Sequence, residues 1–328
     1  MEYTTLGSTG MTVSRITLGC MSFGLDSSSK YGWTLGESES EEILERALDL
    51  GITTFDTANS YSWGDSERVL GSVLEEYDRD ELVVATKVYN PPAENPHPNA
   101  YGLSRKTIEQ ELASSLDRLG LETIDLYQIH RWDYDTPIEQ TLAALDDAVA
   151  RGQLRYIGAS SMWAYQFAEA LWTAERRGFE RFVSMQNQYN LAYREEEREM
   201  LPLCEKHGVG VLPWSPLAKG FLARPHEEMS ATTRGDTDSL LHDRPYSDGG
   251  GKEINERVQE LAGEHDVTMA QISLAWLLHR EWVDSPIVGT TKIEHLEDAI
   301  EALEIKLSDS DVDYLEEPYQ PVRVSGHE

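Results

Sequence analysis

Four residues that can hold or transfer a proton lie near the ends of predicted β-strands. They are Asp56, Tyr61, Lys87 and His130, in the segments FDTANSY, VVATK and LYQIH. Asp56 closes an apolar run, and Tyr61 follows five residues later in the next loop. Because the carboxyl ends of strands in a barrel share one rim, we expect these four side chains to meet there.

The four residue types fit a proton donor together with the groups that tune it. A phenol has a pKa near ~10, and an adjacent ammonium favours its ionised form, so Lys87 would assist Tyr61. Asp56 on the neighbouring strand would keep that ammonium charged. His130 could hydrogen-bond the substrate oxygen that receives the proton. Although each residue alone is more often structural, the set predicts reduction of a carbonyl group.

Eight apolar segments with strand character alternate with helical patterns. The predicted strands are 15–20, 53–58, 82–87, 124–130, 156–160, 182–187, 210–215 and 285–290. Eight such units favour an α/β fold, a closed (β/α)8 TIM barrel, over an open doubly wound sheet. The dinucleotide-binding form of that open sheet requires G-x-G-x-x-G after its first strand, and LGCMSFG does not supply it.

Three local features add to this barrel. Residues 3–15 surround a Gly-Ser-Thr-Gly turn and predict an N-terminal β-hairpin. Residues 217–252, after the seventh strand, are too long for a simple connection and predict a mobile flap over the barrel mouth. Thr136 is the expected N-cap of the helix that follows the predicted strand 124–130, with Pro137 at the first position of that helix. No composition break divides the chain, so residues 1–328 are predicted to form a single domain.

The same segments resemble the aldo-keto reductase superfamily over nearly the whole chain. The resemblance implies a (β/α)8 barrel that binds a nicotinamide cofactor and transfers a hydride to an aldehyde or ketone. Asp56, Tyr61, Lys87 and His130 fall on the family's catalytic positions. SYSWGDSERVLG and PWSPLAKGFL look most like the branch that includes potassium-channel β-subunits and bacterial reductases of broad substrate range.

The resemblance also implies the cofactor contacts, with NADP expected and NAD left open. The nicotinamide would face Ser160, Ser161 and Gln186 and stack on Trp214. The loop after Trp214 would line the pyrophosphate, and VGTTKIEHLEDA would hold the adenosine phosphate. The implied set is Gly19, Cys20, Met21, Asp56, Ser160, Ser161, Gln186, Trp214, Ser215, Pro216, Leu217, Lys219, Gly220, Gly289, Thr290, Thr291, Lys292, His295 and Asp298.

Three loop tryptophans could wall the substrate pocket. Trp33, Trp63 and Trp132 all follow predicted strands on the active face. Together they would suit an apolar or aromatic carbonyl compound, and the alternative is ordinary anchoring of the loops.

Two other classes of protein stay open. A nicotinamide-binding regulatory or redox-sensing subunit with slow turnover would use the same residues. A metal-dependent barrel hydrolase could use Asp56, His130 and Asp133, but a single strand-end His and the nearby Lys87 disfavour a cation site. We therefore predict no metal and a small-molecule carbonyl substrate.

The composition points to an acidic, soluble protein. A net charge of −31 is spread along the chain, whereas eight Trp and fifteen Tyr argue against disorder. Such a surface would repel nucleic acid and suits a halophilic source, where molar salt screens self-repulsion. Cys20 and Cys204 are expected to be buried thiols. Because no leader or apolar run of ~18 residues is present, we expect a cytoplasmic protein without a membrane span.

Salt should therefore stabilise the fold. Lowering NaCl from about 3 M to about 0.05 M should lower the midpoint of thermal unfolding, because self-repulsion is then no longer screened. Circular dichroism against temperature measures the midpoint. An unchanged midpoint at low salt would contradict the halophilic assignment.

Overall fold

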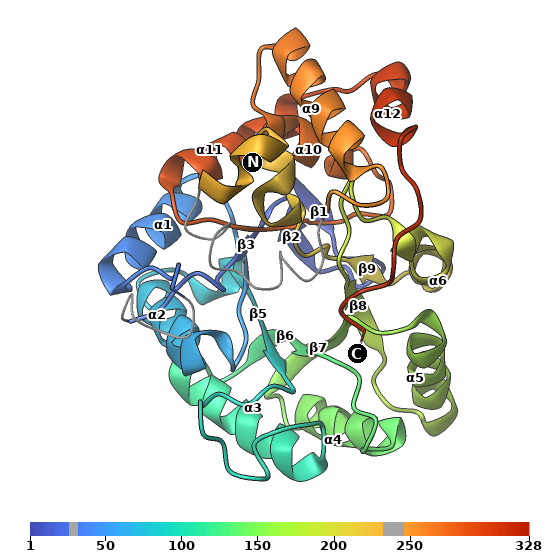
Figure 1. Cartoon of the computed structure of the whole chain (residues 1–328). Helices are drawn as coiled ribbons and strands as arrows, with labels where there is room; N and C mark the ends of the chain where they lie inside the picture. The colour runs from blue at the N-terminus through green and yellow to red at the C-terminus, as the bar shows by residue number, and fades with distance from the viewer. Residues whose placement is uncertain (26–31, 232–245, 328) are drawn as a thin grey trace.

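Eight parallel strands form the centre of the molecule (Figure 1), in the order β10-β3-β4-β5-β6-β7-β8-β9. The structure, a computed structural model, describes residues 1–25, 32–231 and 246–327. The strands are β3 (Thr17–Gly19), β4 (Thr54–Asp56), β5 (Val83–Val88), β6 (Ile124–Ile129), β7 (Leu154–Ser160), β8 (Phe182–Gln186), β9 (Gly210–Val211) and β10 (Ile287–Gly289).

The sheet closes on itself between β9 and β10. The amide of Ile287 donates to the carbonyl of Pro213 at 2.9 Å, and the amide of Asp284 donates to that of Val211 at 3.1 Å. Since β10 also pairs with β3, hydrogen bonds continue around the ring. The predicted (β/α)8 barrel is confirmed, and the open doubly wound sheet is wrong.

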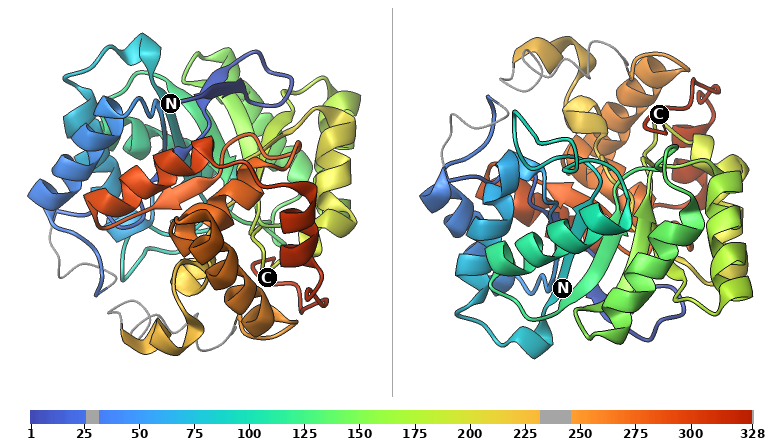
Figure 2. Two further views of the ribbon diagram at one scale, coloured as in Figure 1. Left: turned by 90° about the horizontal axis from the view of Figure 1, so that it is seen from above. Right: turned by 90° about the horizontal axis from the view of Figure 1, so that it is seen from below.

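Helices surround the strands on the outside (Figure 2). They are α1 (Glu37–Asp49), α2 (Asp65–Leu74), α3 (Arg105–Leu119), α4 (Ile138–Ala150), α5 (Ala164–Arg177), α6 (Met200–His207), α9 (Gly251–His265), α10 (Met269–Leu278), α11 (Ile293–Glu301) and α12 (Asp309–Glu316). Apolar residues at helical spacing, such as Ile43, Leu44 and Ala47 of α1, are buried in the core. Across the described ranges, no helix combines the length and apolar character that a bilayer crossing requires.

The predicted N-terminal hairpin is present. Strands β1 (Tyr3–Thr5) and β2 (Thr12–Ser14) pair antiparallel. Leu6 and Val13 are buried against barrel residues such as Leu126 and Ile287, so the hairpin packs on the barrel as an added element.

Two local predictions need correction. Thr136 is not the N-cap of α4; Pro137 is, because its extended backbone (φ −56°, ψ 130°) delays the helix until Ile138. The segment 217–252 is not irregular throughout, because its described part forms the 3-10 helices η4 (Ala218–Ala223) and η5 (His226–Ala231), and α9 begins at Gly251. The centre of the predicted flap, 232–245, lies outside the described residues.

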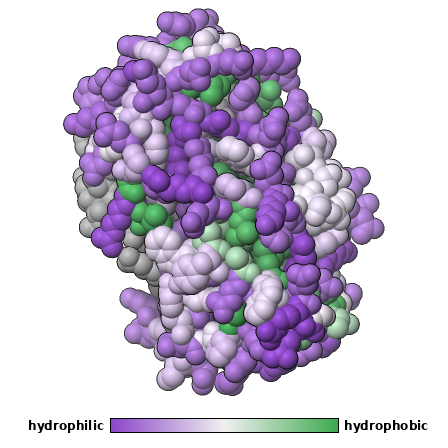
Figure 3. Space-filling view, turned by 90° about the vertical axis from the view of Figure 1, so that its right-hand side faces the viewer, coloured by the Kyte–Doolittle hydropathy of each residue, from purple (hydrophilic) through white to green (hydrophobic). Residues whose placement is uncertain are grey.

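The surface agrees with the acidic composition. Hydrophilic residues predominate on the face seen in Figure 3, and hydrophobic residues are confined to small groups. Basic side chains form surface ion pairs such as Arg105–Asp147 and Arg177–Glu139, at 2.5 and 2.6 Å. With 28 basic against 59 acidic residues in the chain, such pairs cannot neutralise the acidic excess.

One ion pair is instead buried between α2 and α3. Glu67, with 0% exposure, accepts hydrogen bonds from Arg118 Nε at 2.6 Å and from Thr86 Oγ1 at 2.5 Å. Gly64 precedes α2 with φ +95°, and a Cβ there would lie 2.8 Å from the Arg118 side chain. The pair therefore holds the start of α2 and the loop that leads into it.

Removing the Arg118 charge should weaken the fold. Arg118→Ala should cost about 3–5 kcal/mol, because it leaves a buried carboxylate without a partner charge. Arg177→Ala, which breaks the surface pair with Glu139, should cost about 0–1 kcal/mol and serves as the control. Urea unfolding at one salt concentration measures both, and equal losses would contradict the expectation.

Candidate active site

A buried ion pair joins β4 and β5 at the carboxyl end of the barrel. The Nζ of Lys87 lies 2.5 Å from Oδ1 of Asp56, and the two residues are 0% and 2% exposed. Lys87 also donates to the carbonyl of Thr57 at 2.8 Å. The pair therefore satisfies both charges inside the barrel, where an isolated charge would be costly.

Two amide side chains hold the second carboxylate oxygen of Asp56. Gln128 of β6 and Gln186 of β8 donate to Oδ2 at 3.0 and 2.9 Å, and Gln186 also donates to Gln128 Oε1 at 3.2 Å. Gln128 was not among the residues predicted from the sequence. Its signal was a Gln within the apolar run IDLYQI, all of which is buried.

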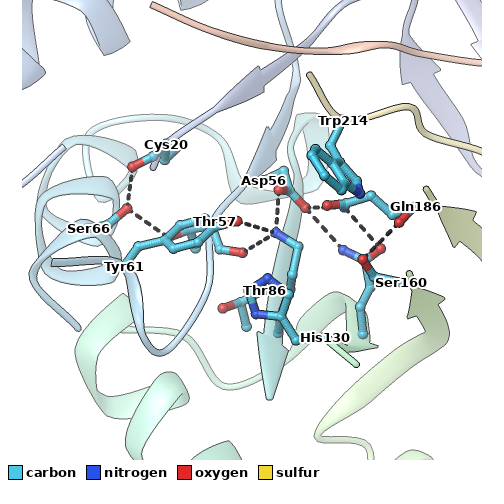
Figure 4. A network of polar contacts seen from close by, with 12 residues as sticks. Cys20, Asp56, Thr57, Tyr61, Ser66, Thr86, His130, Ser160, Gln186 and Trp214 are labelled. Atoms are coloured by element: carbon cyan, nitrogen blue, oxygen red, sulfur yellow. Dashed lines mark hydrogen bonds and ion pairs between the residues drawn. The ribbon is translucent and has the colours of Figure 1, made fainter. Parts of the chain in front are cut away.

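Tyr61 and His130 complete the group. Lys87 Nζ lies 3.4 Å from the Tyr61 hydroxyl and 4.9 Å from the ring centre. The rings of Tyr61 and His130 meet edge to face with 5.8 Å between centroids. The four predicted catalytic positions are therefore neighbours, and Figure 4 shows Tyr61 on one side of Asp56 with Gln186, Ser160 and Trp214 on the other.

The loop that carries Tyr61 has an unusual backbone. Tyr61 begins the 3-10 turn η1 (Tyr61–Gly64), in which Ser62 and Trp63 have φ of 47° and 59°. Ser62 Oγ donates to the carbonyl of Phe23 at 2.8 Å. Left-handed residues other than Gly are strained, so the surroundings must hold this turn, as they often do at functional sites.

Burial and charge act against each other on both titrating partners. Burial raises the pKa of Tyr61 above its ordinary value of 10.0, and the Lys87 ammonium offsets only part of that rise. Burial by itself lowers the pKa of Lys87, but Asp56 and Tyr61 outweigh it and leave that pKa above 10.5. Lys87 thus acts on Tyr61 in the expected direction, whereas burial has the larger effect and keeps the phenol protonated.

The residues implied for the nicotinamide also converge. Ser160 Oγ donates to the Gln186 carbonyl at 2.8 Å, and Trp214 Nε1 donates to Ser161 Oγ at 3.0 Å. Asn187, another residue that the sequence did not reveal, accepts from the Ser161 amide at 2.8 Å. Hydroxyl and amide groups beside an indole are the chemistry that a planar ring bearing a carboxamide requires.

The loop after Trp214 carries the residues implied for the pyrophosphate. Ser215, Ala218, Lys219 and Gly220 have φ of 52°, 49°, 55° and 98°. The amides of Ala218 and Gly220 donate within the loop, to the carbonyls of Ser215 and Leu217, both at 2.9 Å. Lys219 adds a positive charge, which would suit an anion at this loop. Pro216 is buried and Leu217 is half-buried in the same loop.

The end of β10 and the start of α11 hold the residues implied for the adenosine phosphate. Thr290 Oγ1 accepts from the amide of Lys292, the N-cap of α11, at 3.0 Å. Burial, then the charge of Lys292, lowers the pKa of His295, and Arg224 contributes in the same direction. Arg224 was not among the predicted residues. The other implied residues here are Gly289 and Thr291, both exposed, and Asp298, whose pKa is raised by burial.

The end of β3 lies beside Asp56. The Cys20 amide donates to the Asp56 carbonyl at 2.8 Å, and the Cys20 carbonyl accepts from Ser66 Oγ at 2.7 Å. Both Cys20 and Cys204 are buried free thiols, as expected, and burial raises the pKa of each. Gly19 needs its hydrogen, because a Cβ would lie 2.8 Å from Ile287; Met21 is half-buried.

The three predicted pocket tryptophans stand in loops after β3, β4 and β6. Trp33, Trp63 and Trp132 are each half-buried, and Trp132 packs on the core. Their place on the carboxyl side of the barrel is compatible with a substrate wall.

The alternative metal site gains no support from Asp133. Its carboxylate accepts hydrogen bonds from the amides of Leu103 at 2.7 Å and Asp135 at 2.9 Å, and so orders loops. Within residues 1–25, 32–231 and 246–327, no group of three or more His, Cys, Asp or Glu is arranged to bind a metal ion.

Comparison with known proteins gives a consistent family. Residues 15–320 match the model of the aldo/keto reductase family. A protein of Schizosaccharomyces pombe assigned as an aryl-alcohol dehydrogenase is 45% identical over 99% of this chain and 97% of its own. Versiconal hemiacetal acetate reductase of Aspergillus parasiticus is 42% identical, covering 98% of each chain, and an aldo-keto reductase of Fusarium vanettenii is 40% identical over 100% and 93%. These fungal relatives do not point specifically to the channel β-subunit branch.

Gln128 should matter for stability as well as for the site. Gln128→Met keeps the length of the side chain but removes a donor to the Asp56 carboxylate, which should cost about 1.5–3 kcal/mol. Gln140→Met, on the exposed side of α4, should stay within about 0.5 kcal/mol and is the matched control. Urea unfolding compares the two variants. An unchanged free energy of unfolding in Gln128→Met would show that the Asp56 carboxylate does not need this donor.

Proposed function

This chain belongs to the aldo/keto reductase family and is an oxidoreductase enzyme, and we propose that it reduces aldehydes or ketones to alcohols with Tyr61 as the proton donor. The observation that carries this proposal is Lys87 Nζ, which contacts both Asp56 and the Tyr61 hydroxyl, at 2.5 and 3.4 Å. A phenol placed against a buried ammonium can give up its proton and remain stabilised as the anion.

Each residue has a separate task in the reaction. Tyr61 donates its proton to the carbonyl oxygen as negative charge develops there. Lys87 stabilises the phenolate that forms, and Asp56 keeps Lys87 charged and in position. His130, edge-on to the Tyr61 ring, orients the same oxygen. In the reverse direction Tyr61 would take the proton back from an alcohol.

The cofactor proposed is NADPH, which supplies the hydride when bound. Ser160, Ser161 and Gln186 would hold the carboxamide, and Trp214 would stack on the ring. Lys219 and the left-handed loop around it would bind the pyrophosphate. Lys292 and Arg224, whose positive charges act on His295 near the start of α11, would favour the extra phosphate of NADP over NAD.

An aromatic carbonyl is the proposed substrate class. The names of the relatives from Schizosaccharomyces pombe and Aspergillus parasiticus refer to an aryl alcohol and to a hemiacetal acetate. Half-buried Trp33, Trp63 and Trp132 could contact an aromatic ring. We also propose that the enzyme acts in the cytoplasm of a salt-adapted cell, where an acidic surface keeps it soluble.

Tyr61→Phe tests the assignment. The variant should bind NADPH as the wild type does but lose about 10²–10⁴-fold in kcat for an aromatic aldehyde, because the proton donor is gone. Fluorescence titration gives the binding, and NADPH absorbance gives the turnover in molar salt. The control is Tyr101→Phe, which should keep full activity. Tyr101 is exposed, and its hydroxyl donates a hydrogen bond to the hydroxyl of Tyr89.

The pH profile gives a second readout of the same site. A proton donor works below its pKa, and burial keeps the pKa of Tyr61 above 10.0, so kcat/KM for reduction should not fall through deprotonation of Tyr61 below about pH 10.

Wild-type turnover in Tyr61→Phe would refute the assigned donor. Tight NADPH binding with negligible wild-type turnover would instead favour the regulatory subunit.

A further inference from the structure

A strap of chain after α12, residues 319–327, runs along the loops that follow β7, β8 and β9. Figure 1 shows it as the red segment that leaves α12 and ends near β8. Its backbone is held at three points: Gln320 N donates to Gly249 O at 2.8 Å, Val322 N to Glu195 Oε1 at 3.0 Å and Ser325 N to Tyr193 OH at 3.2 Å. The strap is therefore ordered by specific bonds along its length.

A buried contact between two side chains fastens the strap beyond these points. His327 Nε2 lies 3.1 Å from Glu196 Oε1, and the two side chains are only 5% and 4% exposed. The His327 ring also meets Trp163 edge to face at 4.9 Å between centroids. A contact this well buried is unlike a surface pair, because losing one partner leaves the other in a poorly solvated place.

The same carboxylate connects to the segment proposed to hold the nicotinamide. Glu196 Oε2 accepts from Asn187 Nδ2 at 2.7 Å, and Asn187 Oδ1 accepts from the Ser161 amide at 2.8 Å. Ser161 has φ +52°, a left-handed conformation that needs support from its surroundings. The chain of contacts from His327 thus ends on a strained residue of the site.

A second contact closes this chain into a ring. Trp214 Nε1 donates to Ser161 Oγ at 3.0 Å. Gly326, next to His327, has φ +86°, and a Cβ there would lie 3.3 Å from Cζ2 of Trp214. The strap therefore reaches Ser161 from two directions, through a carboxylate and through an indole.

We propose that His327 and Glu196 form a latch that positions Ser161 and Trp214 for the nicotinamide cofactor. This inference rests on the proposed function for the identity of the ligand. Without His327, the Glu196 carboxylate keeps its contacts with the Tyr193 hydroxyl at 3.3 Å and with Asn187 but loses a third one. Asn187 is then held less firmly, and the Ser161 backbone relaxes. The strap then no longer supports Trp214, so cofactor binding weakens although no catalytic residue has changed.

Hydrogen exchange of the cofactor-free protein tests the latch directly. In His327→Ala, amides in the peptide 158–163 should exchange faster than in the wild type. The Ser161 amide then loses the shorter of its two hydrogen bonds, to Asn187 Oδ1 at 2.8 Å, and keeps the one to the Gln186 carbonyl at 3.2 Å. His327→Gln keeps an N–H donor and should restore slow exchange. The control, His265→Ala, removes the partly exposed contact between Nε2 of His265 on α9 and Oδ2 of Asp311 on α12, which lie 3.6 Å apart. This variant should leave the exchange of peptide 158–163 unchanged.

Cofactor binding supplies the second measurement. The NADPH dissociation constant of His327→Ala should rise about tenfold, a common size for coupling between linked sites. KM for NADPH should rise by more than kcat falls. The urea midpoint should fall, because the buried Glu196 loses a partner, but exchange in β4, β5 and β6 should stay as it is in His265→Ala. A general loss of structure would instead speed exchange throughout the barrel.

The outcomes separate this inference from the proposed function. Unchanged exchange at 158–163 in His327→Ala would overturn the latch, whether or not NADPH binds. Faster exchange with unchanged NADPH affinity would overturn the coupling to the cofactor. Failure of the wild type to bind NADPH or NADH would refute the proposed cofactor, and the exchange result would still decide whether the latch exists.

Discussion

The ion pair between Lys87 and Asp56 is the interaction on which the rest of the site depends. An unpaired charge at this depth would be costly, so every polar atom around the pair must be placed to satisfy it. Its partners come from β4, β5, β6 and β8, and the register pairs Lys87 with Gln128 and Ser160 with Gln186. A shift by one residue would turn Lys87 to the opposite face of its strand. The register of the barrel strands therefore fixes the partners of the charged pair.

Two further buried networks support the loops around this pair. On one side, Glu67 and Arg118 hold the start of α2, which follows the turn that carries Tyr61. On the other, Glu196 and Asn187 hold Ser161. Buried hydrogen-bonded networks of this kind rigidify their surroundings, because each bonded group has one favourable arrangement. The acidic surface has the opposite character, with its charges solvated and sensitive to salt.

Neighbouring strands made the four catalytic candidates predictable, but their supporting residues were not. Gln128 has the same apolar neighbours in the chain as a core residue, and only the approach of β4 shows that its amide meets Asp56. Thr136 has the residue type of an N-cap, yet the extended backbone of Pro137 starts α4 one residue later than predicted. Local preferences of this kind are weak beside tertiary packing, so element boundaries are less certain than the elements themselves.

Local periodicity and composition are enough to predict the alternation of strands and helices, the acidic surface and the residue types at the strand ends. Which polar groups meet depends on how the chain folds. Glu196 and His327 stand 131 positions apart, and Asp56 and Gln186 stand 130 apart, so nothing local links them. Closure of the barrel brings such residues within hydrogen-bonding distance, and burial then makes each contact necessary, since an unpaired polar group there would destabilise the fold.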